Sequence, residues 1–506
     1  MVIVDPNHVR DNALMHRPTR IARRALAAFA LLTCLSANAT IPASEAQTLT
    51  DLYNATNGGS WTNQTNWLTA GAECQWYGVT CDAGETHVIG LVLSSNKLSG
   101  PLPDLSPLTT LQALNLSFNS TLTGTAAAIT NLGELRTLTL TVCGFTGTFP
   151  ALSVFPHLQT VTISNTQFSG ALPDPSGLQE LTAYSISTTA FSGTIPTITN
   201  VPMLTTFLVP ANQLVGPLPS FAGLASLQHL SIANNPLDVP LPDLSGLTSL
   251  QDFLAASIGA SGSIPAMTNL PNLNTYDVSH NQLTGGFPVL NGGFHPANVS
   301  VNDNQLSGSV PNFSSLAFGS LKAYNNLLSG PLPPFPGGGL SYLDLHNNQF
   351  TGSVAAWNGT QWWYIDLSDN LLDGTVPSLQ PLTSLQQFIA AHNQLIGTAP
   401  SLPPNVEFEL YDISYNAFTG PLPVLPATNT LVRFRVEHNE LSGPVPDIAG
   451  TLIRDYQESA LCPNHLDPHT TTQTLLDWNH AANLFFPFTP NWYDGCDDWI
   501  YVHGFE

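Results

Sequence analysis

One pattern of apolar and polar positions recurs along most of the chain. Its general form is apolar-x-x-apolar-x-apolar-x-x-Asn-x-apolar-Ser/Thr-Gly-x-apolar-Pro, and residues 273–288 are one copy of it. A fixed repeat of 20 to 50 residues is typical of a solenoid. Alignment on the Asn position gives sixteen slots at a mean spacing of about 23 residues: Asn96, Asn119, Cys143, Thr166, Thr189, Asn212, Asn235, Ile258, Asn281, Asn304, Asn326, Asn348, Asn370, Asn393, Asn416 and Asn439.

Each part of this unit has a physical role. The apolar-x-apolar pair, such as Tyr276 and Val278, predicts a short strand with one buried face. The Asn amide is expected to bind backbone groups of its own turn and of the next coil, because each such group left unpaired costs roughly 1 to 3 kcal/mol. Gly and Pro turn the chain and rule out a helix on the return path. Ile258 cannot replace the amide, so we expect an imperfect ladder there.

Three copies of the repeat resemble a known family. Residues 96–103, 304–311 and 439–446 read Asn-Lys-Leu-Ser-Gly-Pro-Leu-Pro, Asn-Gln-Leu-Ser-Gly-Ser-Val-Pro and Asn-Glu-Leu-Ser-Gly-Pro-Val-Pro. They are similar to the plant-type leucine-rich repeat of receptor ectodomains and polygalacturonase-inhibiting proteins. The resemblance implies an α/β solenoid of about sixteen repeats over residues 87–455, with a parallel β-sheet on the concave side and a cap at each end. It does not identify a ligand, because such scaffolds bind unrelated partners.

The segments outside the repeats are expected to be caps. Residues 47–86 are similar to the N-terminal cap of this repeat class, and their Trp61, Trp67 and Trp76 are expected to seal the first coil rather than to stack on sugars. Residues 456–506 are expected to form the C-terminal cap. Because both raw ends of a solenoid need sealing, we predict two disulfides, Cys74–Cys81 and Cys462–Cys496. Cys143 occupies an Asn slot and is expected to be a structural thiol.

Residues 1–46 have the order of a secretory signal. Four arginines (Arg17, Arg20, Arg23 and Arg24) precede an apolar run at 25–35, and small residues follow at 37–39 and 44–46. The run is too short to span a membrane, although a lipid anchor at Cys34 is an alternative. We therefore expect a protein that is secreted or held at the cell surface.

The charge of the chain limits its partners. The net charge is −23, and loss of the arginine-containing leader makes it more negative. Nucleic acids and anionic membranes bind through clustered Lys and Arg, so both are unlikely partners by this criterion and no membrane span is expected. Cationic or neutral ligands are favoured instead.

The search for catalytic motifs yields no candidate. H-E-x-x-H, G-x-S-x-G, the phosphate-binding loop and the dinucleotide fingerprint do not occur in the sequence. The run from Cys462 to His469 contains ligand types at metal-like spacing, but Cys462 is expected to be oxidised, so no metal site is predicted. These observations predict a binding protein without a cofactor rather than an enzyme.

The strongest functional candidate is the exposed face of the predicted sheet. Positions −6, −4, −2 and −1 from the Asn slot should face outward or flank the strand, with neighbouring repeats about 4.8 Å apart. Tyr and Asp rows can bind a protein or peptide, whereas a structural role for the same polar side chains stays open. A neutral glycan, or inhibition of a glycan-degrading enzyme, is the alternative function, and the Thr-rich face at 137–187 leaves binding to an ordered surface such as ice as a third. The residues of the expected concave patch are Asp277, His280, Asp303, Tyr342, Asp344, His346, Tyr364, Asp366, Asp369, His392, Asp412, Tyr415, Arg433, Arg435 and His438.

Overall fold

The computed structural model describes residues 40–467, except for residue 268 and the segments 289–296, 313–318, 335–338, 358–360, 405–406, 426–430 and 447–458. The chain divides into two units, Met1–Ala39 and Thr40–Glu506, and all described residues belong to the second. Among the described residues, no helix is long and apolar enough to cross a membrane.

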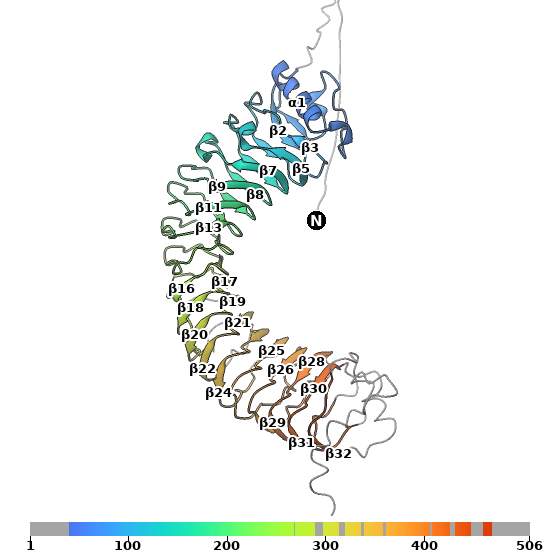
Figure 1. Ribbon diagram of the computed structural model, residues 1–506, viewed down its shortest axis with the longest axis vertical. Coiled ribbons are helices and arrows are strands. Elements are labelled where there is room, and N and C mark those ends of the chain that lie inside the picture. The colour runs from blue at the N-terminus through green and yellow to red at the C-terminus, as the bar shows by residue number, and fades with distance from the viewer. Residues whose placement is uncertain are drawn as a thin grey trace, which may run out of the picture. The chain divides into compact units, whose positions relative to one another are not determined.

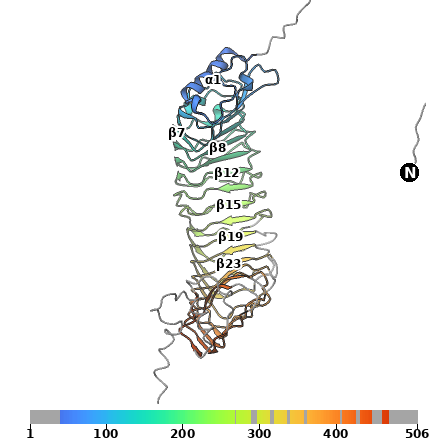
Figure 2. The same ribbon diagram turned by 90° about the vertical axis from the view of Figure 1, so that its right-hand side faces the viewer.

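One strand precedes every predicted Asn slot, and together these strands form the main sheet. Within the described residues this sheet has seventeen strands, of which β1 is antiparallel to β2 and the other sixteen are parallel. Successive strands appear as rungs in Figure 2, and the predicted parallel sheet of the repeats is thereby confirmed. The strands are β1 (Val79–Cys81), β2 (Val88–Val92), β4 (Ala113–Asn115), β6 (Thr137–Thr141), β8 (Thr160–Ser164), β10 (Ala183–Ser187), β12 (Thr206–Leu208), β14 (His229–Ser231), β15 (Asp252–Leu254), β17 (Thr275–Asp277), β19 (Asn298–Ser300), β21 (Ser320–Lys322), β23 (Tyr342–Asp344), β25 (Tyr364–Asp366), β26 (Gln387–Ile389), β28 (Phe408–Asp412) and β30 (Leu431–Arg435).

A second set of strands begins at or just after the Asn slots, and sequence analysis did not predict it. Figure 1 shows β16, β18 and β20 on the side of the repeats opposite to β17, β19 and β21. This set forms three smaller sheets of six, five and four strands. The strands are β3 (Ser99–Pro101), β5 (Asn119–Gly124), β7 (Cys143–Thr148), β9 (Gln167–Ala171), β11 (Ala190–Gly193) and β13 (Gln213–Leu214); β16 (Ser261–Ser263), β18 (Gln282–Gly285), β20 (Gln305–Gly308), β22 (Leu327–Pro331) and β24 (Gln349–Thr351); β27 (Ile396–Thr398), β29 (Ala417–Gly420), β31 (Glu440–Pro444) and β32 (His465–Asp467).

The first break in the second set has a visible cause in the sequence. The copy at residues 235–242 reads Asn-Pro-Leu-Asp-Val-Pro-Leu-Pro, so Pro236 and Pro240 remove two N–H donors. Asp238 stands where other copies have the Ser of Ser-Gly, and it adopts a φ of 54°. The second set therefore stops at β13 and resumes at β16.

Helix is confined to a small part of the described chain. The one described α-helix is α1 (Ala43–Ala55) in the N-terminal cap, and short 3-10 turns occur at η1 (Gly58–Ser60), η2 (Glu73–Gln75), η3 (Ala126–Ile129) and η4 (Leu152–Val154). The return path of the coils is otherwise extended or irregular, as expected from its prolines. The helical part of the predicted α/β solenoid is thus mainly its cap.

The N-terminal cap seals the first coil with aromatic rings. Trp61, Trp67 and Trp76 are buried, and the centroid distances for Trp61–Trp67 and Trp67–Trp76 are both 4.8 Å. The predicted disulfide Cys74–Cys81 is present, with a Cα–Cα distance of 5.5 Å. Cys462 is also disulfide-bonded, while its predicted partner Cys496 lies outside the described residues.

The asparagine ladder joins consecutive coils. Asn326 donates from Nδ2 to the carbonyl oxygens of Val301, Ala323 and Tyr324 at 3.0 to 3.2 Å. Its Oδ1 accepts from the N–H of Leu306 at 2.9 Å. The amide therefore satisfies backbone groups of its own turn, as predicted, and of the preceding coil, whereas sequence analysis expected the next coil.

The ladder varies where the slot is not Asn. Ile258 is fully buried and has no polar side-chain atom, and the N–H of Leu237 binds the carbonyl of Asn235 at 2.9 Å instead of an amide oxygen. The expected imperfection at this repeat is confirmed. Cys143 donates its thiol to the carbonyl of Leu116 at 3.2 Å, and burial raises its pKa to about 11.

Two boundaries differ from the expected ones. Asn464 donates from Nδ2 to Val436 and Leu461 at 2.8 and 2.6 Å, so it fills a further ladder slot beyond residue 455. At the other end α1 begins at Ala43, inside the segment expected to be a leader. Ile41 and Glu45 are buried in the cap, which assigns residues 40–46 to the folded unit.

Candidate binding surface on the main sheet

The predicted patch lies along the outward side of β17 to β30 and the turns that follow these strands; we call this area the main-sheet surface. Six of its residues occupy the position directly before the Asn slot, where φ lies between 52° and 57°: His280, Asp303, Asp369, His392, Tyr415 and His438. Val142 and Phe118 have the same left-handed backbone in repeats far from the patch. The conformation is therefore a requirement of the coil and is not by itself a functional signal.

Aspartates of the patch share a structural role that sequence analysis missed. Oδ1 of Asp366 accepts from the N–H and the hydroxyl of Ser368 at 2.9 and 2.6 Å. Asp277 and Asp412 bind the serines two positions later in the same way. One carboxylate oxygen thus holds the turn at the end of the strand through the serine, and the other oxygen makes no contact with that serine.

The residue two positions after Asp344 is His346, where the other three aspartates are followed by a serine. Asp344 and Asp366 lie in register on β23 and β25, and the two residues are almost fully buried, at 4% and 7% exposure. His346 places Nδ1 2.7 Å from Oδ1 of Asp344 and 3.9 Å from Oδ2 of Asp366. The hydrogen bond that His346 makes to Asp344 raises the pKa of the imidazole, and burial raises the pKa of Asp366. One imidazole therefore lies between two carboxylates.

Aromatic rings border this cluster. Tyr342 and Tyr364 stack with centroids 4.4 Å apart and planes 5° apart, and their hydroxyls donate to Oδ2 of Asp344 and Asp366 at 3.4 and 3.2 Å. Burial, followed by the charge of Asp344, raises the pKa of Tyr342 to about 12. The two phenols are neutral hydrogen-bond donors at physiological pH.

Three further residues of this area were missed by sequence analysis. Trp363 is 42% exposed, and its ring lies 6.0 Å from that of Tyr342. Lys322 places Nζ 5.4 Å from the centroid of Tyr342, and the ring of Tyr324 stacks on His346 at 4.5 Å. Lys322 and Tyr324 stand at positions −4 and −2 of their repeat, so the same column rule could have found them.

A second cluster lies two strands further along the sheet. Arg435 on β30 places Nη1 3.5 Å from Oδ2 of Asp412 on β28 and Nη2 2.9 Å from Oε1 of Glu437. Burial raises the pKa of Glu437. The other predicted arginine, Arg433, lies in register with Leu410 instead.

The remaining predicted residues form smaller groups. His392, Tyr415 and His438 stack in a column with successive centroid distances of 4.3 and 4.1 Å. His280 and Asp303 form a separate ion pair at 3.2 Å. The fifteen residues are thus several clusters along one surface and not one site.

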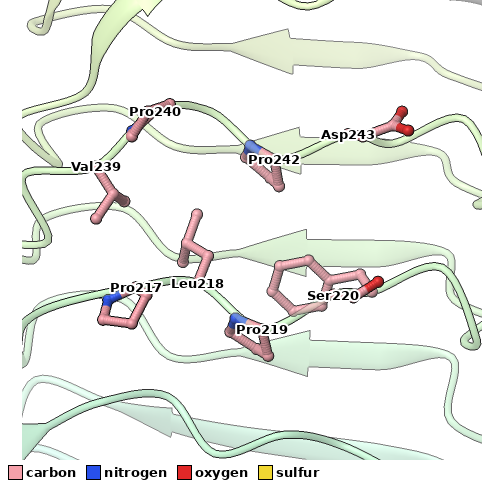
Figure 3. A pocket seen from close by; sticks show the side chains of 9 residues that line it. Pro217, Leu218, Pro219, Ser220, Val239, Pro240, Pro242 and Asp243 are labelled. Atoms are coloured by element: carbon pink, nitrogen blue, oxygen red, sulfur yellow. The ribbon is translucent and has the colours of Figure 1, made fainter.

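One pocket lies elsewhere, at the break in the second set of strands. Its volume is about 410 Å³, and Figure 3 shows Leu218 of one coil and Val239 of the next projecting toward each other, with Pro217, Pro219 and Pro240 beside them. The lining is mostly proline and aliphatic. Its carboxylate, Asp243, is bound by the N–H and hydroxyl of Ser245. The pocket therefore offers few groups to orient a polar ligand.

Comparison with known proteins agrees with this architecture. Residues 226–247 match the family model described as Leucine Rich Repeat, and the chain has the fold of a leucine-rich-repeat solenoid. It resembles the Arabidopsis receptor kinase HAESA, solved with the peptide hormone IDA and the co-receptor SERK1, at 22% identity and a TM-score of 0.56, over 84% of this chain and 86% of that one.

Two further solved structures are similar over most of the chain. The structure of PEPR1 with AtPEP1 matches at 22% identity and a TM-score of 0.52, over 83% of this chain and 76% of that one. A TDR receptor matches at 25% identity and a TM-score of 0.53, over 74% and 80%. The expected resemblance to receptor ectodomains is confirmed at the level of the fold.

Proposed function

We propose that the protein binds a peptide or a protein segment along the main-sheet surface between β21 and β30. The observation that carries the proposal is the exposed indole of Trp363 beside the stacked pair Tyr342 and Tyr364. Aromatic rings that are already held by their neighbours lose little conformational entropy on binding, which is why they dominate contact energies at interfaces. Asp344, Asp366 and Lys322 add charge beside these rings.

The similar structures support this proposal. HAESA was solved with the peptide hormone IDA and PEPR1 with AtPEP1, and both share the solenoid fold with this chain. The disulfide at Cys74 and Cys81 and the order of residues in the leader support a location outside the cell. The net charge of −23 favours a partner that is basic or neutral.

Selection from a displayed peptide library against the purified, exported chain tests this function. The selected peptides are then titrated against Trp363→Ala and, as a control, Tyr77→Ala, whose aromatic side chain in the N-terminal cap is exposed to a similar extent (39%). We expect Trp363→Ala to weaken binding at least about 10-fold and Tyr77→Ala to leave it unchanged. Equal affinity for both variants would show that the main-sheet surface is not the site.

A neutral glycan is the second candidate, because the same exposed indole could stack on a sugar ring. The two variants are therefore also applied to a glycan array. Binding of a neutral glycan that Trp363→Ala abolishes, without selection of any peptide, would replace the first proposal with the second.

A further inference from the structure

We propose that Asp344, His346 and Asp366 bind a divalent transition-metal ion on the main-sheet surface. Each residue offers one ligand atom, and these three atoms all lie within 4.8 Å of one another. Two carboxylate oxygens and one imidazole nitrogen form a donor set that suits Zn²⁺ or Mn²⁺ better than Ca²⁺, which takes six to eight oxygens. Sequence analysis named all three residues but predicted no metal, because they come from two repeats and meet only in the fold.

One of the two distances from the imidazole nitrogen already suits a shared ion, and the other is that of a hydrogen bond. Zinc binds oxygen and nitrogen at about 2.0 to 2.2 Å, so two of its ligand atoms lie roughly 3 to 4 Å apart. Nδ1 of His346 lies 2.7 Å from Asp344 and 3.9 Å from Asp366. The 3.9 Å separation lies within that range, whereas the 2.7 Å hydrogen bond is one that an ion would replace, with Nδ1 giving up its proton.

Charge is the observation that points to a cation here in particular. Asp412 has the same serine contact as Asp366, but it faces the guanidinium of Arg435. Asp344 and Asp366 lie in register and are almost fully buried. Within the described part of the chain neither forms an ion pair with Lys or Arg, and Lys322, in register with Asp344 on β21, lies over the ring of Tyr342. One imidazole can offset at most one of two adjacent negative charges, whereas a divalent cation offsets both.

The surroundings hold the ligands in place. Ser368 fixes one oxygen of Asp366, and the ring of Tyr324 stacks on the imidazole with planes 9° apart. The hydroxyls of Tyr342 and Tyr364 bind the outer carboxylate oxygens. Partners of this kind orient metal ligands and raise metal affinity.

Calorimetric titration of the tag-free, EDTA-treated chain with ZnCl₂ and with MnCl₂ tests the proposal. The diagnostic variant is Asp366→Asn, and the matched control is Asp412→Asn, which alters the same aspartate–serine contact at a site with an arginine. We expect one metal ion to bind the wild-type chain, and Asp366→Asn to weaken that binding about 100-fold or more while Asp412→Asn has little effect.

A second variant, His346→Gln, separates ligand loss from misfolding, and circular dichroism confirms the fold of each variant. We expect His346→Gln to weaken metal binding as Asp366→Asn does. Absence of metal binding by the wild-type chain, or equal affinity in Asp366→Asn, His346→Gln and Asp412→Asn, would overturn the proposal. The titration contains no peptide, so its failure leaves the proposed function unaffected, and loss of peptide binding in Trp363→Ala leaves the metal site unaffected.

Discussion

Arg435 on β30 and Asp412 on β28 face each other across two adjacent strands, with Nη1 3.5 Å from Oδ2. The same guanidinium also donates to Glu437, so one cation serves two buried carboxylates. Removal of the cation from such a group leaves buried negative charges without an opposite charge. Most of the loss of stability comes from these uncompensated charges.

The first prediction concerns this arginine. Arg435→Met keeps most of the aliphatic stem but leaves Asp412 and Glu437 unpaired, so we expect the free energy of unfolding to fall by about 1 to 3 kcal/mol in urea denaturation at pH 7. The control Arg136→Met breaks an ion pair with Glu180 at 3.0 Å in which both side chains are more than one-third exposed. We expect that change to cost less than about 1 kcal/mol, and equal losses in the two variants would refute the account.

The second prediction concerns the asparagine ladder. Asn326→Ala removes an amide whose two N–H groups are shared among three carbonyl oxygens and whose oxygen accepts one N–H, so we expect the free energy of unfolding to fall by roughly 2 to 4 kcal/mol. The control is Asn54→Ala, because Asn54 is exposed on α1 and lies outside the ladder. If Asn326→Ala lowers the free energy of unfolding no more than the control does, in thermal or urea unfolding, the amides do not stabilise the coils.

The architecture was predictable because one constraint acts at every repeat. Each coil must bury its apolar positions and satisfy its turn, so the slots from Asn96 to Asn439 predict the strands of the main sheet one by one. The ladder slot at Asn464 was missed because its spacing from Asn439 is longer than the mean period and because no Ser-Gly pair follows it. The second set of strands was not predicted because its short segments begin at or just after the Asn and continue into Gly and Pro, residues from which the sequence pattern predicts a turn.

The candidate surface was predictable in position but not in chemistry. The column rule placed Asp344 beside Asp366 because neighbouring repeats align in register. It could not show that Asp366 and Asp412 fix their strand ends through serine, since that contact depends on side-chain direction. Nor could it show that His346 turns its ring between two carboxylates.

The third prediction is a pH dependence in the N-terminal cap. His87 places Nδ1 2.7 Å from Oε1 of Glu45, and this hydrogen bond raises the pKa of His87 above its ordinary value of 6.5. A raised folded-state pKa means that the contribution to stability is fully present below about pH 6.5 and is lost as the pH rises through the folded-state pKa. The stability difference between wild type and His87→Ala should therefore shrink from pH 6 to pH 9 in urea denaturation. A difference that grows over this range would contradict the assignment.

The fourth prediction concerns the cleavage site of the proposed leader. Ile41 is buried, and Oε2 of Glu45 accepts from the N–H of Val88 at 2.7 Å. Cleavage after Ala46 would remove both contacts and leave a buried donor unpaired, which costs about 1 to 3 kcal/mol. Cleavage after Ala39 keeps them, so we expect intact-mass analysis and N-terminal sequencing of the processed protein to identify Thr40 as its first residue.

Two substitutions in α1 test the importance of these contacts. Glu45→Ala should lower the unfolding temperature of the chain that begins at Thr40, whereas Asp51→Ala on the exposed side of α1 should not. A native chain that begins at Gln47 with unchanged stability would show that the first turn of α1 is dispensable.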